Sequence, residues 1–572
     1  MTSIGADVEP AECKQGRVLA LMNSRVEKFA TRAAFRIKEA GQSRSLTYGE
    51  LSQQAIKLSS CLLAEGINPG DRIAILGESS PEWAIAFFGS IRAGATIVPL
   101  DVKLTETELT SILTNCRPAV LFSSAKHVEA AQSLQSKVNS IKQVYLLDAG
   151  KSEQTLKTIA DLHAESLSAG VDRSADEVAL IVYTSGTTGS PKGVMTTFGN
   201  LIFQINSCED MVALNENDRF LSILPLNHLL ELTGGFLGML NTGATVNFCH
   251  SLFPQEIIRT MHDEKITGMI GVPLFFKSLK GGIEREIKKK GPEELERFRA
   301  GLEKAALLPM AQRRQLFAPV LEALGSEVRV FICGGAPLES EIALFFENLG
   351  IHMLQGYGLT ETSPVISGNA LRANKIGSVG QGLPGLDIRI DKKSPTDAEG
   401  EILTRGPHVM KGYYTRDDLT REVIDQDGWF HTGDLGHLDE EGFLFITGRI
   451  KNMIVLGGGK KIFPEEVEAC LSQCPLIKEL CVIGHKSAEG FKEGTEEVLA
   501  VVVPTDALGA EYKDDAPGLK KRLTKELNTL AEQLAPYKRP GRIVVKPDEF
   551  EKTATRKVKR NAVQTWLAEQ KE

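Results

Sequence analysis

Several features that mark other classes of protein are scarce or missing in this chain of 572 residues. Its nine cysteines are scattered, and the closest pair, Cys470 and Cys474, has no metal-ligand partner nearby. We therefore expect reduced, buried thiols in a cytoplasmic protein and no disulfide framework or zinc site. Basic residues are not in excess, since 66 Lys and Arg stand against 74 Asp and Glu, and the net charge of -8 argues against a nucleic-acid partner.

Long hydrophobic runs are also missing. The longest candidate, residues 84–100, is interrupted by Arg92 and two glycines and is typical of a buried helix followed by a strand. Acidic residues such as Asp7 and Glu9 interrupt the N-terminus, so we expect no secretory signal. A cytoplasmic location follows, with peripheral contact at a membrane as a further expectation.

The chain does contain alternating short apolar runs and amphipathic stretches. Residues 71–76 and 95–100 resemble buried strands, and residues 81–92 between them have helical character. Strand, helix and strand at this spacing predict βαβ units and parallel sheets. Further strands are expected at 178–183, 267–272 and 328–332.

Two segments depart from this pattern. Residues 280–325 are rich in charge and helix formers and predict two or three surface helices. A solvent-exposed cover is the simpler interpretation of these helices, and a dedicated binding arm is the alternative. After about residue 450, apolar strands at 479–483 and 498–503 precede a charged helix at 518–534. We expect a separate small α+β domain there.

A loop rich in glycine, serine and threonine follows the apolar residues 178–182. Its backbone can curl with N–H groups inward, and its hydroxyls and lysine add donors, so it suits a polyphosphate. It is not the P-loop of kinases, because the Gly-Lys-Ser/Thr ending is missing. Loops of this composition are often plain connections, but eleven residues in this order (183–193) are far more specific. Its candidate phosphate-binding residues are Thr184, Ser185, Gly186, Thr187, Thr188, Gly189 and Lys192.

This loop resembles the phosphate loop of the adenylate-forming superfamily: acyl-CoA synthetases, adenylation domains of peptide synthetases, and firefly luciferase. The resemblance extends over nearly the whole chain in the same order. It is strongest to long-chain fatty acyl-CoA ligases, and it implies ATP as a substrate and Mg²⁺ as a cofactor. The other segments that carry it are 46–51, 334–338, 356–362, 428–434, 447–449 and 552–557.

The resemblance implies an adenine pocket. Tyr357 offers a flat face for the base, and Gly356 and Gly358 give room for close approach, although a core tyrosine is an equal expectation for that position alone. The remaining implied adenine residues are Gly335, Ala336 and Pro337.

The resemblance also implies contacts to phosphate, metal and ribose. Thr360 can donate to a phosphate, and Glu361 is a hard oxygen ligand suited to Mg²⁺, with Thr184 as a second metal contact. Asp434 can accept from the ribose hydroxyls, and Arg449 can add donors. Taken alone, Asp434 or Arg449 would more simply form a surface salt bridge.

Lys557 is the sharpest catalytic candidate. Negative charge develops at the α-phosphate when a carboxylate attacks it, and a positioned cation stabilises that charge. The family pattern has glycine immediately before this lysine and often proline three before it, whereas this chain has Arg556 and Ala554. Arg556 is therefore a competing cation, and with Lys559 and Arg560 nearby, a basic tail is the simpler alternative.

A second glycine cluster resembles the loop that lines the path of the thiol after the small domain rotates. Close backbone approach is its physical advantage, and a plain turn is the alternative. The hinge of that rotation is expected at Lys451, which must absorb a large backbone change. The expected thiol-binding residues are Gly457, Gly458, Gly459 and Lys460.

The acid is expected to be aliphatic. By resemblance, His228 lies near the reacting carboxylate, although a satisfied core histidine is an alternative. The apolar residues 232–238 suit a tunnel wall, and no Phe-Asp pair that would bind an amino acid ammonium is present. The thiol is expected to be coenzyme A. The alternative is the phosphopantetheine of an acyl carrier protein acting in trans, since no carrier segment follows Glu572.

Together these features predict an α/β protein and an AMP-forming acid–thiol ligase. Residues 1–450 are expected to bind ATP and acid, with parallel sheets flanked by helices, the helical insert at about 280–325 and a small β-barrel at about 360–445. Residues 451–572 are expected to form a mobile α+β domain. The expected catalytic residues are Thr184, His228, Glu361 and Lys557. A light-emitting oxygenase and a catalytically silent nucleotide- or adenylate-binding module are remote alternatives.

Overall fold

The computed structural model separates the chain into two compact units. Unit 1 comprises Met1–Asp387 and Thr404–Phe430, and unit 2 comprises Ile388–Leu403 and His431–Glu572. The sequence predicted one boundary at residue 450, whereas these units group 388–403 and 431–450 with the C-terminal part. The described residues are 18–39, 42–149, 156–164, 166–184, 191–251, 253–394, 396–456, 461–486, 496–552 and 558–570.

A seven-stranded sheet forms the first half of unit 1. Its order is β18-β8-β7-β4-β3-β5-β6; β3 pairs in parallel with β4 and β5, while β7 and β8 form an antiparallel hairpin. The predicted parallel arrangement is confirmed. The strands are β3 (Arg72–Leu76), β4 (Thr96–Leu100), β5 (Val120–Ser123), β6 (Gln143–Leu146), β7 (Val178–Thr184), β8 (Lys192–Thr197) and β18 (Gly412–Tyr413).

A nine-stranded sheet forms the second half of unit 1, in the order β15-β14-β13-β12-β11-β9-β10-β1-β2. Its central strands from β1 to β13 are parallel, and antiparallel strands extend both ends. The strands are β1 (Ala33–Glu39), β2 (Gln42–Thr47), β9 (Arg219–Ser222), β10 (Thr245–Phe248), β11 (Gly268–Gly271), β12 (Val330–Cys333), β13 (His352–Gly358), β14 (Val365–Gly368) and β15 (Gln381–Gly382).

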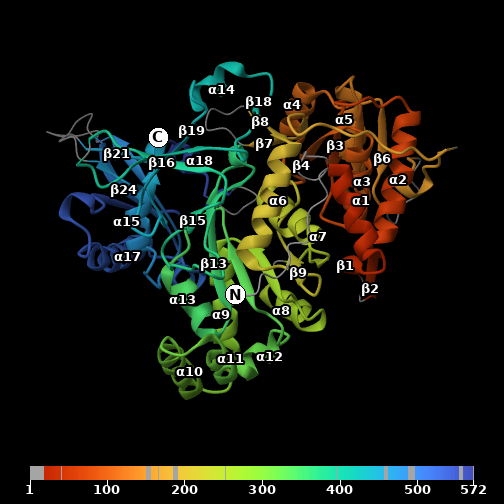
Figure 1. Ribbon diagram of the computed structural model, residues 1–572. Coiled ribbons are helices and arrows are strands. Elements are labelled where there is room, and N and C mark those ends of the chain that lie inside the picture. The colour runs from red at the N-terminus through yellow and green to blue at the C-terminus, as the bar shows by residue number, and fades with distance from the viewer. Residues whose placement is uncertain are drawn as a thin grey trace. The chain divides into compact units, whose positions relative to one another are not determined.

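Helices cover both sheets of unit 1 (Figure 1). Several begin at sequence caps; Thr47, for example, forms a capping box with Glu50. The helices are α1 (Val18–Phe29), α2 (Tyr48–Ala64), α3 (Pro81–Arg92), α4 (Glu106–Cys116), α5 (Val128–Lys137), α6 (Phe198–Val212), the π-helix η4 (Leu230–Gly238), α7 (Met239–Asn241), α8 (Pro254–Asp263), α13 (Ser340–Leu349) and α14 (Asp417–Val423).

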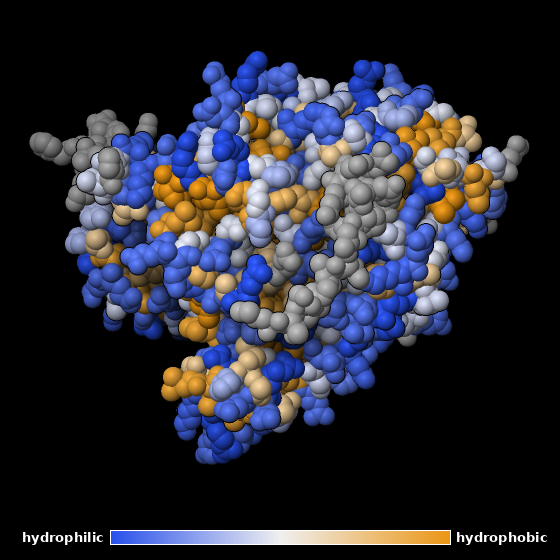
Figure 2. Space-filling model, viewed as in Figure 1, coloured by the Kyte–Doolittle hydropathy of each residue, from blue (hydrophilic) through white to orange (hydrophobic). Residues whose placement is uncertain are grey.

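The charged segment between β11 and β12 forms four helices, one more than the upper prediction: α9 (Pro273–Lys288), α10 (Pro292–Ala305), α11 (Met310–Leu316) and α12 (Ala318–Ala323). Figure 1 shows α10, α11 and α12 grouped beside α9. Leu307 and Leu316 are exposed in this insert, by 91% and 50%. Figure 2 shows hydrophobic colour at the same end of the view. Peripheral membrane contact stays a prediction.

Unit 2 contains three sheets. The four-stranded sheet has the order β16-β17-β19-β20. Among the described residues its edge strands are β16 and β20, and β14 and β15 belong to the nine-stranded sheet. The barrel expected at about 360–445 stays a prediction. The strands are β16 (Asp387–Asp391), β17 (Gly400–Arg405), β19 (Phe430–Leu438), β20 (Leu444–Arg449), β21 (Ile454–Val455), β22 (Lys461–Ile462), β23 (Ile477–Lys486), β24 (Glu496–Pro504) and β25 (Arg542–Val545).

The last part of unit 2 is α+β, as predicted. Strand β24 lies between β23 and β25, and its apolar face packs against α15 and α17. The helices are α15 (Pro464–Leu471), α16 (Asp506–Glu511), α17 (Ala516–Ala531) and α18 (Arg560–Glu569). Within the described part of the chain, no helix is both long and apolar enough to cross a membrane.

Candidate active site

Strands β7 and β8 hold the two ends of the predicted phosphate loop. Thr184 ends β7 and is paired with Lys192, the first residue of β8, and both are half-buried. A side chain at Gly193 would lie 2.8 Å from the Ile181 methyl, so the hairpin requires a glycine there. The predicted residues Ser185, Gly186, Thr187, Thr188 and Gly189 lie outside the described residues.

Tyr413 connects the base of this loop to the predicted metal ligand. Its hydroxyl donates to Glu361 Oε1 at 2.8 Å, and Lys192 Nζ lies 5.0 Å from the centroid of its ring. Tyr413 is 4% exposed and belongs to β18, whose antiparallel pairing with β8 fixes its position. The sequence alone does not identify Tyr413, because nothing in its pattern relates this residue to a carboxylate 52 positions earlier.

The backbone around Glu361 is fixed by hydrogen bonds on both sides. Glu361 lies in the short helix η5 (Thr360–Thr362), and its carbonyl accepts from the amide of Met410 at 2.9 Å. The Gln204 amide donates to the carbonyls of Thr362 and Val365. The Glu361 carboxylate is therefore held in a defined place.

This site fits a magnesium ion that takes most of its ligands from phosphate and water. Among the described residues no three His, Cys, Asp or Glu side chains gather into a metal-binding group. Mg²⁺ commonly uses one or two carboxylates together with substrate phosphates and retained waters. Glu361, with one oxygen already occupied by Tyr413, offers such a single carboxylate.

The adenine candidates occupy β13 and the turn after β12. Tyr357 is half-buried, and Gly335 has a φ of +81°, which favours glycine. A Cβ at Gly358 would overlap the carbonyl oxygen of Pro364, whereas one at Gly356 would lie 3.7 Å from its nearest neighbour. The glycine at 358 is thus required by the chain's own backbone, whereas a Cβ at 356 would make an ordinary van der Waals contact, and the close approach of adenine there stays a prediction. In the same turn Ala336 is half-buried and Pro337 is exposed.

His228 precedes the π-helix η4, and its Nε2 atom is buried with no hydrogen-bond partner in the part of the chain that the structure describes. Burial lowers the pKa of this histidine below its usual value, so its ring is neutral at pH 7. π-Helical turns are frequent at functional sites. The unpaired ring nitrogen is therefore available for a substrate carboxylate.

Glu231 lies one turn after His228 and is fully buried. Both of its carboxyl oxygens are buried, and burial, only partly offset by the Ser222 hydroxyl, raises its pKa to about 8. A Cβ at Gly235 would lie 2.7 Å from Glu231 Oε1, so this glycine makes room for the carboxyl group. The wall beside His228 is thus uncharged at neutral pH, a property that the residue types did not indicate.

In unit 2, the two ribose candidates face each other. Asp434 on β19 is paired with Arg449 on β20, and Arg449 Nε lies 3.2 Å from Asp434 Oδ1. The amide of Asp434 also donates to the Thr432 hydroxyl at 3.1 Å. The pair can present a carboxylate and a guanidinium together, and its role toward ribose stays a prediction.

The segment that carries the predicted catalytic lysine is anchored at both ends. Lys557 itself, like Gly457, Gly458, Gly459 and Lys460, lies outside the described residues. Before it, Lys552 forms an ion pair with Glu479; after it, Arg560 bonds both oxygens of Glu468 at 2.6 and 2.7 Å. Arg560 is thus engaged in a mostly buried ion pair and is not part of a free basic tail.

Lys451, the predicted hinge, lies in the short helix η6 (Ile450–Asn452), which directly follows β20. It is exposed. This position joins the four-stranded sheet to the C-terminal α+β part of unit 2, and the hinge stays a prediction.

Comparison with known proteins gives the family. A model of the AMP-binding enzyme matches residues 22–414, and a model of the AMP-binding enzyme C-terminal domain matches residues 466–557. The chain belongs to the AMP-binding enzyme family. The predicted relationship to adenylate-forming enzymes is confirmed. This AMP-binding enzyme is an acid–thiol ligase of the kind that forms an acyl-adenylate, and the family uses ATP, Mg²⁺ and coenzyme A.

Its relatives include ligases for different acids. A feruloyl-CoA synthase of an Amycolatopsis species is 32% identical over 486 residues, 84% of this chain and 88% of its own length. A long-chain-fatty-acid–CoA ligase of Mycobacterium bovis is 31% identical over 464 residues, 77% of this chain and 75% of its own. The solved structure of ATP-bound MatB from Rhodopseudomonas palustris is 26% identical, covers 96% of this chain and 98% of its own, and superposes with a TM-score of 0.76.

Proposed function

We propose that this AMP-binding enzyme activates a long-chain fatty acid and transfers the acyl group to coenzyme A. The observation that carries the proposal is η4, whose nine residues present an apolar, uncharged wall next to His228. Residues 231–238 are all buried, and Glu231 within them is neutral below about pH 8. An aliphatic tail gains about 0.8 kcal/mol for each methylene buried against such a wall.

The chain's own residues would divide the reaction as follows. His228 positions the acid carboxylate, and the 184–192 loop and Thr360 hold the phosphates of ATP. Lys557 stabilises the charge that develops at the α-phosphate as the carboxylate attacks and pyrophosphate leaves. Glu361 would hold the Mg²⁺, which neutralises phosphate charge when bound. The thiol then attacks the acyl carbon, and AMP leaves.

An aromatic acid is the second candidate. The relative at 32% identity acts on feruloyl groups by name, and another, at 29%, on indoleacetate. A flat ring needs width close to the carboxylate, whereas a chain needs length. Gly234, whose Cβ would lie 2.9 Å from the Ile270 side chain, leaves little width beside η4, which favours the chain.

Acid-dependent pyrophosphate exchange tests the choice. We expect kcat/KM to rise from acetate to long-chain acids by about fourfold for each added methylene until the tail fills its site, because 0.8 kcal/mol corresponds to about that factor. Ferulate and indoleacetate should be poor substrates. A higher kcat/KM for ferulate than for every saturated acid would reverse the proposal.

The acceptor is tested separately, with the acid already chosen. Thioester formation is measured with coenzyme A and with a phosphopantetheinylated acyl carrier protein. We expect coenzyme A to be the better acceptor. Faster transfer to the carrier protein would show that the thiol is delivered by a protein in trans.

A further inference from the structure

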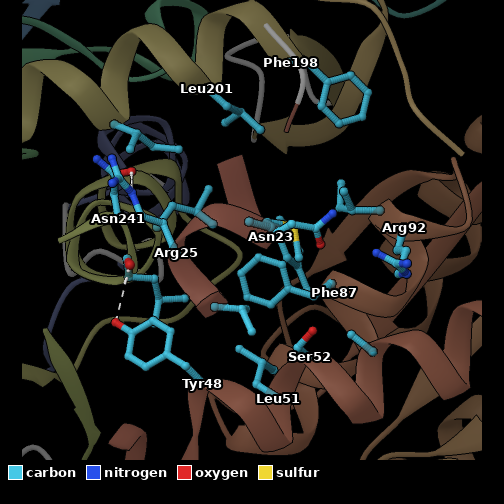
Figure 3. Close-up of a pocket in the computed structure, with 18 residues that line it drawn as sticks. Asn23, Arg25, Tyr48, Leu51, Ser52, Phe87, Arg92, Phe198, Leu201 and Asn241 are labelled. Atoms are coloured by element: carbon cyan, nitrogen blue, oxygen red, sulfur yellow. Dashed lines mark hydrogen bonds between the residues drawn. The ribbon is translucent and has the colours of Figure 1, made fainter. Parts of the chain in front are cut away.

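Two polar side chains beside the apolar cavity of unit 1 connect elements of the fold (Figure 3). The Tyr48 hydroxyl on α2 donates to the carbonyl of Leu240 at 3.4 Å, and Arg25 Nε on α1 donates to Asn241 Oδ1 at 3.1 Å. Both contacts hold α7 in place. In unit 2, a contact of the same kind ends beside the predicted ribose carboxylate, and there it bears on the reaction.

Glu401 makes this contact from β17, the strand next to β19. Its Oε1 accepts from the amide of Gly433 at 3.0 Å, and its Oε2 lies 3.3 Å from His431 Nδ1. A carboxylate that accepts from a backbone amide forms a charge-assisted hydrogen bond, which is stronger than a neutral one. Glu401 therefore fastens β17 to the backbone directly before Asp434.

The turn at Gly433 depends on such a contact. Gly433 has a φ of +70°, and a Cβ built there would meet no atom within 4 Å. Crowding therefore does not select this conformation, and glycine adopts many others readily. On the next residue, the amide of Asp434 donates to the Thr432 hydroxyl, which in turn donates to the Ile402 carbonyl at 2.7 Å. Two consecutive amides are thus held against β17.

Asp434 is the residue whose position these contacts determine. It is 8% exposed, and Arg449 Nε lies 3.2 Å from its Oδ1. A group that binds two neighbouring hydroxyls has to be held to within about 0.5 Å of its productive place. Arg449 orients the end of the Asp434 side chain, while Glu401 and Thr432 hold the backbone from which that side chain extends.

We propose that Glu401 is a positioning residue for the nucleotide ribose. It holds the Gly433 amide so that the Asp434 carboxylate meets both ribose hydroxyls, and it acts through Asp434 and not on the nucleotide itself. Asp434 accepts from the ribose of ATP in the proposed function, on which this assignment rests.

The affinity for nucleotides with and without ribose hydroxyls tests the proposal. ATP and 2′,3′-dideoxy-ATP are titrated into the full chain with Mg²⁺ and followed by calorimetry, with displacement titrations for the weaker ligand. Acid and thiol are left out, so the outcome does not depend on which acid the enzyme activates. We expect Glu401→Ala to raise the Kd for ATP about tenfold, because a hydrogen bond to a charged group contributes about that factor or more. The Kd for 2′,3′-dideoxy-ATP should change less than about twofold, since Asp434 has no hydroxyl to bind there.

Three further variants separate the contact from the fold. Glu401→Met keeps the length of the side chain without an oxygen and should behave as Glu401→Ala does. Glu401→Gln keeps an oxygen that accepts from Gly433 and should bind ATP within about threefold of the wild type. Glu399→Ala removes a carboxylate two residues earlier and, as the matched control, should leave both Kd values unchanged. Melting temperatures identify any variant that fails to fold.

Equal losses of affinity for ATP and 2′,3′-dideoxy-ATP in the folded Glu401 variants, or an unchanged Kd for ATP, would overturn the proposal. Asp434→Ala distinguishes the two assignments. A selective loss for ATP in Asp434→Ala without one in Glu401→Ala and Glu401→Met would overturn the role of Glu401 alone. Equal losses for both nucleotides in Asp434→Ala would overturn the ribose assignment, and the role of Glu401 with it.

Discussion

Replacing Tyr413 by phenylalanine tests whether Glu361 is the metal ligand. The change removes one hydroxyl, which donates to Glu361 at 2.8 Å, and keeps the ring that Lys192 contacts. A hydrogen bond to a charged group contributes about 1.5–3 kcal/mol, which corresponds to about 10- to 100-fold in an equilibrium. Loss of a partner that orients a metal ligand costs a similar factor in metal affinity.

We therefore expect the Mg²⁺ concentration for half-maximal pyrophosphate exchange to rise about tenfold or more in Tyr413→Phe. The rate at saturating Mg²⁺ should fall less, because excess metal compensates for a poorly oriented carboxylate. Tyr414→Phe is the matched control, because Tyr414 is the next residue and packs against a different hydrophobic cluster, and its bond to the Gly193 carbonyl comes from its backbone amide.

An unchanged Mg²⁺ titration in a Tyr413→Phe protein with a normal melting temperature would contradict this expectation. Glu361 would then be held by its backbone alone, or would not contact the metal. A further variant, Tyr413→Leu, also removes the ring beside Lys192. If Tyr413→Leu alone impairs exchange, the contribution of Tyr413 comes from positioning the lysine.

Four other outcomes are expected. Glu361→Gln should make pyrophosphate exchange slower and less dependent on Mg²⁺, as measured by the same Mg²⁺ titration. Lys557→Ala should slow adenylate formation about 100-fold or more but spare thioester formation from supplied acyl-adenylate, and equal losses would contradict its role. Gly358→Ala should destabilise the protein by about 3 kcal/mol or more because its Cβ overlaps backbone, while Gly356→Ala should be tolerated, as measured by thermal unfolding. The pKa of Glu231 is raised from about 4.5 in the unfolded chain to about 8 in the folded protein. The resulting contribution to stability is fully present below pH 4.5 and is lost as the pH rises through 8. Glu231→Gln should therefore gain stability relative to wild type as the pH rises from 5 to 8.5, by up to about 1.4 kcal/mol per pH unit. A stability difference between the two proteins that stays constant over this pH range, measured by thermal unfolding, would contradict this.

Much of unit 1 was predictable because its local signals agree with its packing. Helix α3 spans Pro81–Arg92, the range predicted, because Ser80 accepts from the amide of Trp83 and a proline follows it at the first helical position. Strand β7 extends the predicted range by one residue, to Thr184, because β8 continues to pair with it. In both places the apolar pattern, the cap or turn and the burial indicate the same element.

The rest depends on contacts between distant residues. A π-helix at Leu230–Gly238 has no sequence period of its own, and its glycines are explained only by what they touch, Ile270 and the Glu231 carboxyl group. The strands at the start of the region expected to form a barrel, about 360–445, are a second example. Strands β14 and β15 are short, and the edge of the larger sheet, which the sequence does not reveal, satisfies their backbone hydrogen bonds.

The anchors around Lys557 connect the fold to the proposed division of the reaction. Lys552 and Val558 form an antiparallel bridge, and Arg560 joins α18 to α15 through Glu468. Because burial raises the pKa of Glu468 while Arg560 opposes that shift, the pair is stable only when both partners are present. The sequence placed arginine where the family pattern has glycine, at Arg556, and so suggested a rival cation. We propose that any rotation of the C-terminal α+β part about Lys451 would carry Lys557 toward or away from the reacting phosphate, because Lys552 and Val558 on either side of it belong to that part. That coupling is what the selective loss in Lys557→Ala measures.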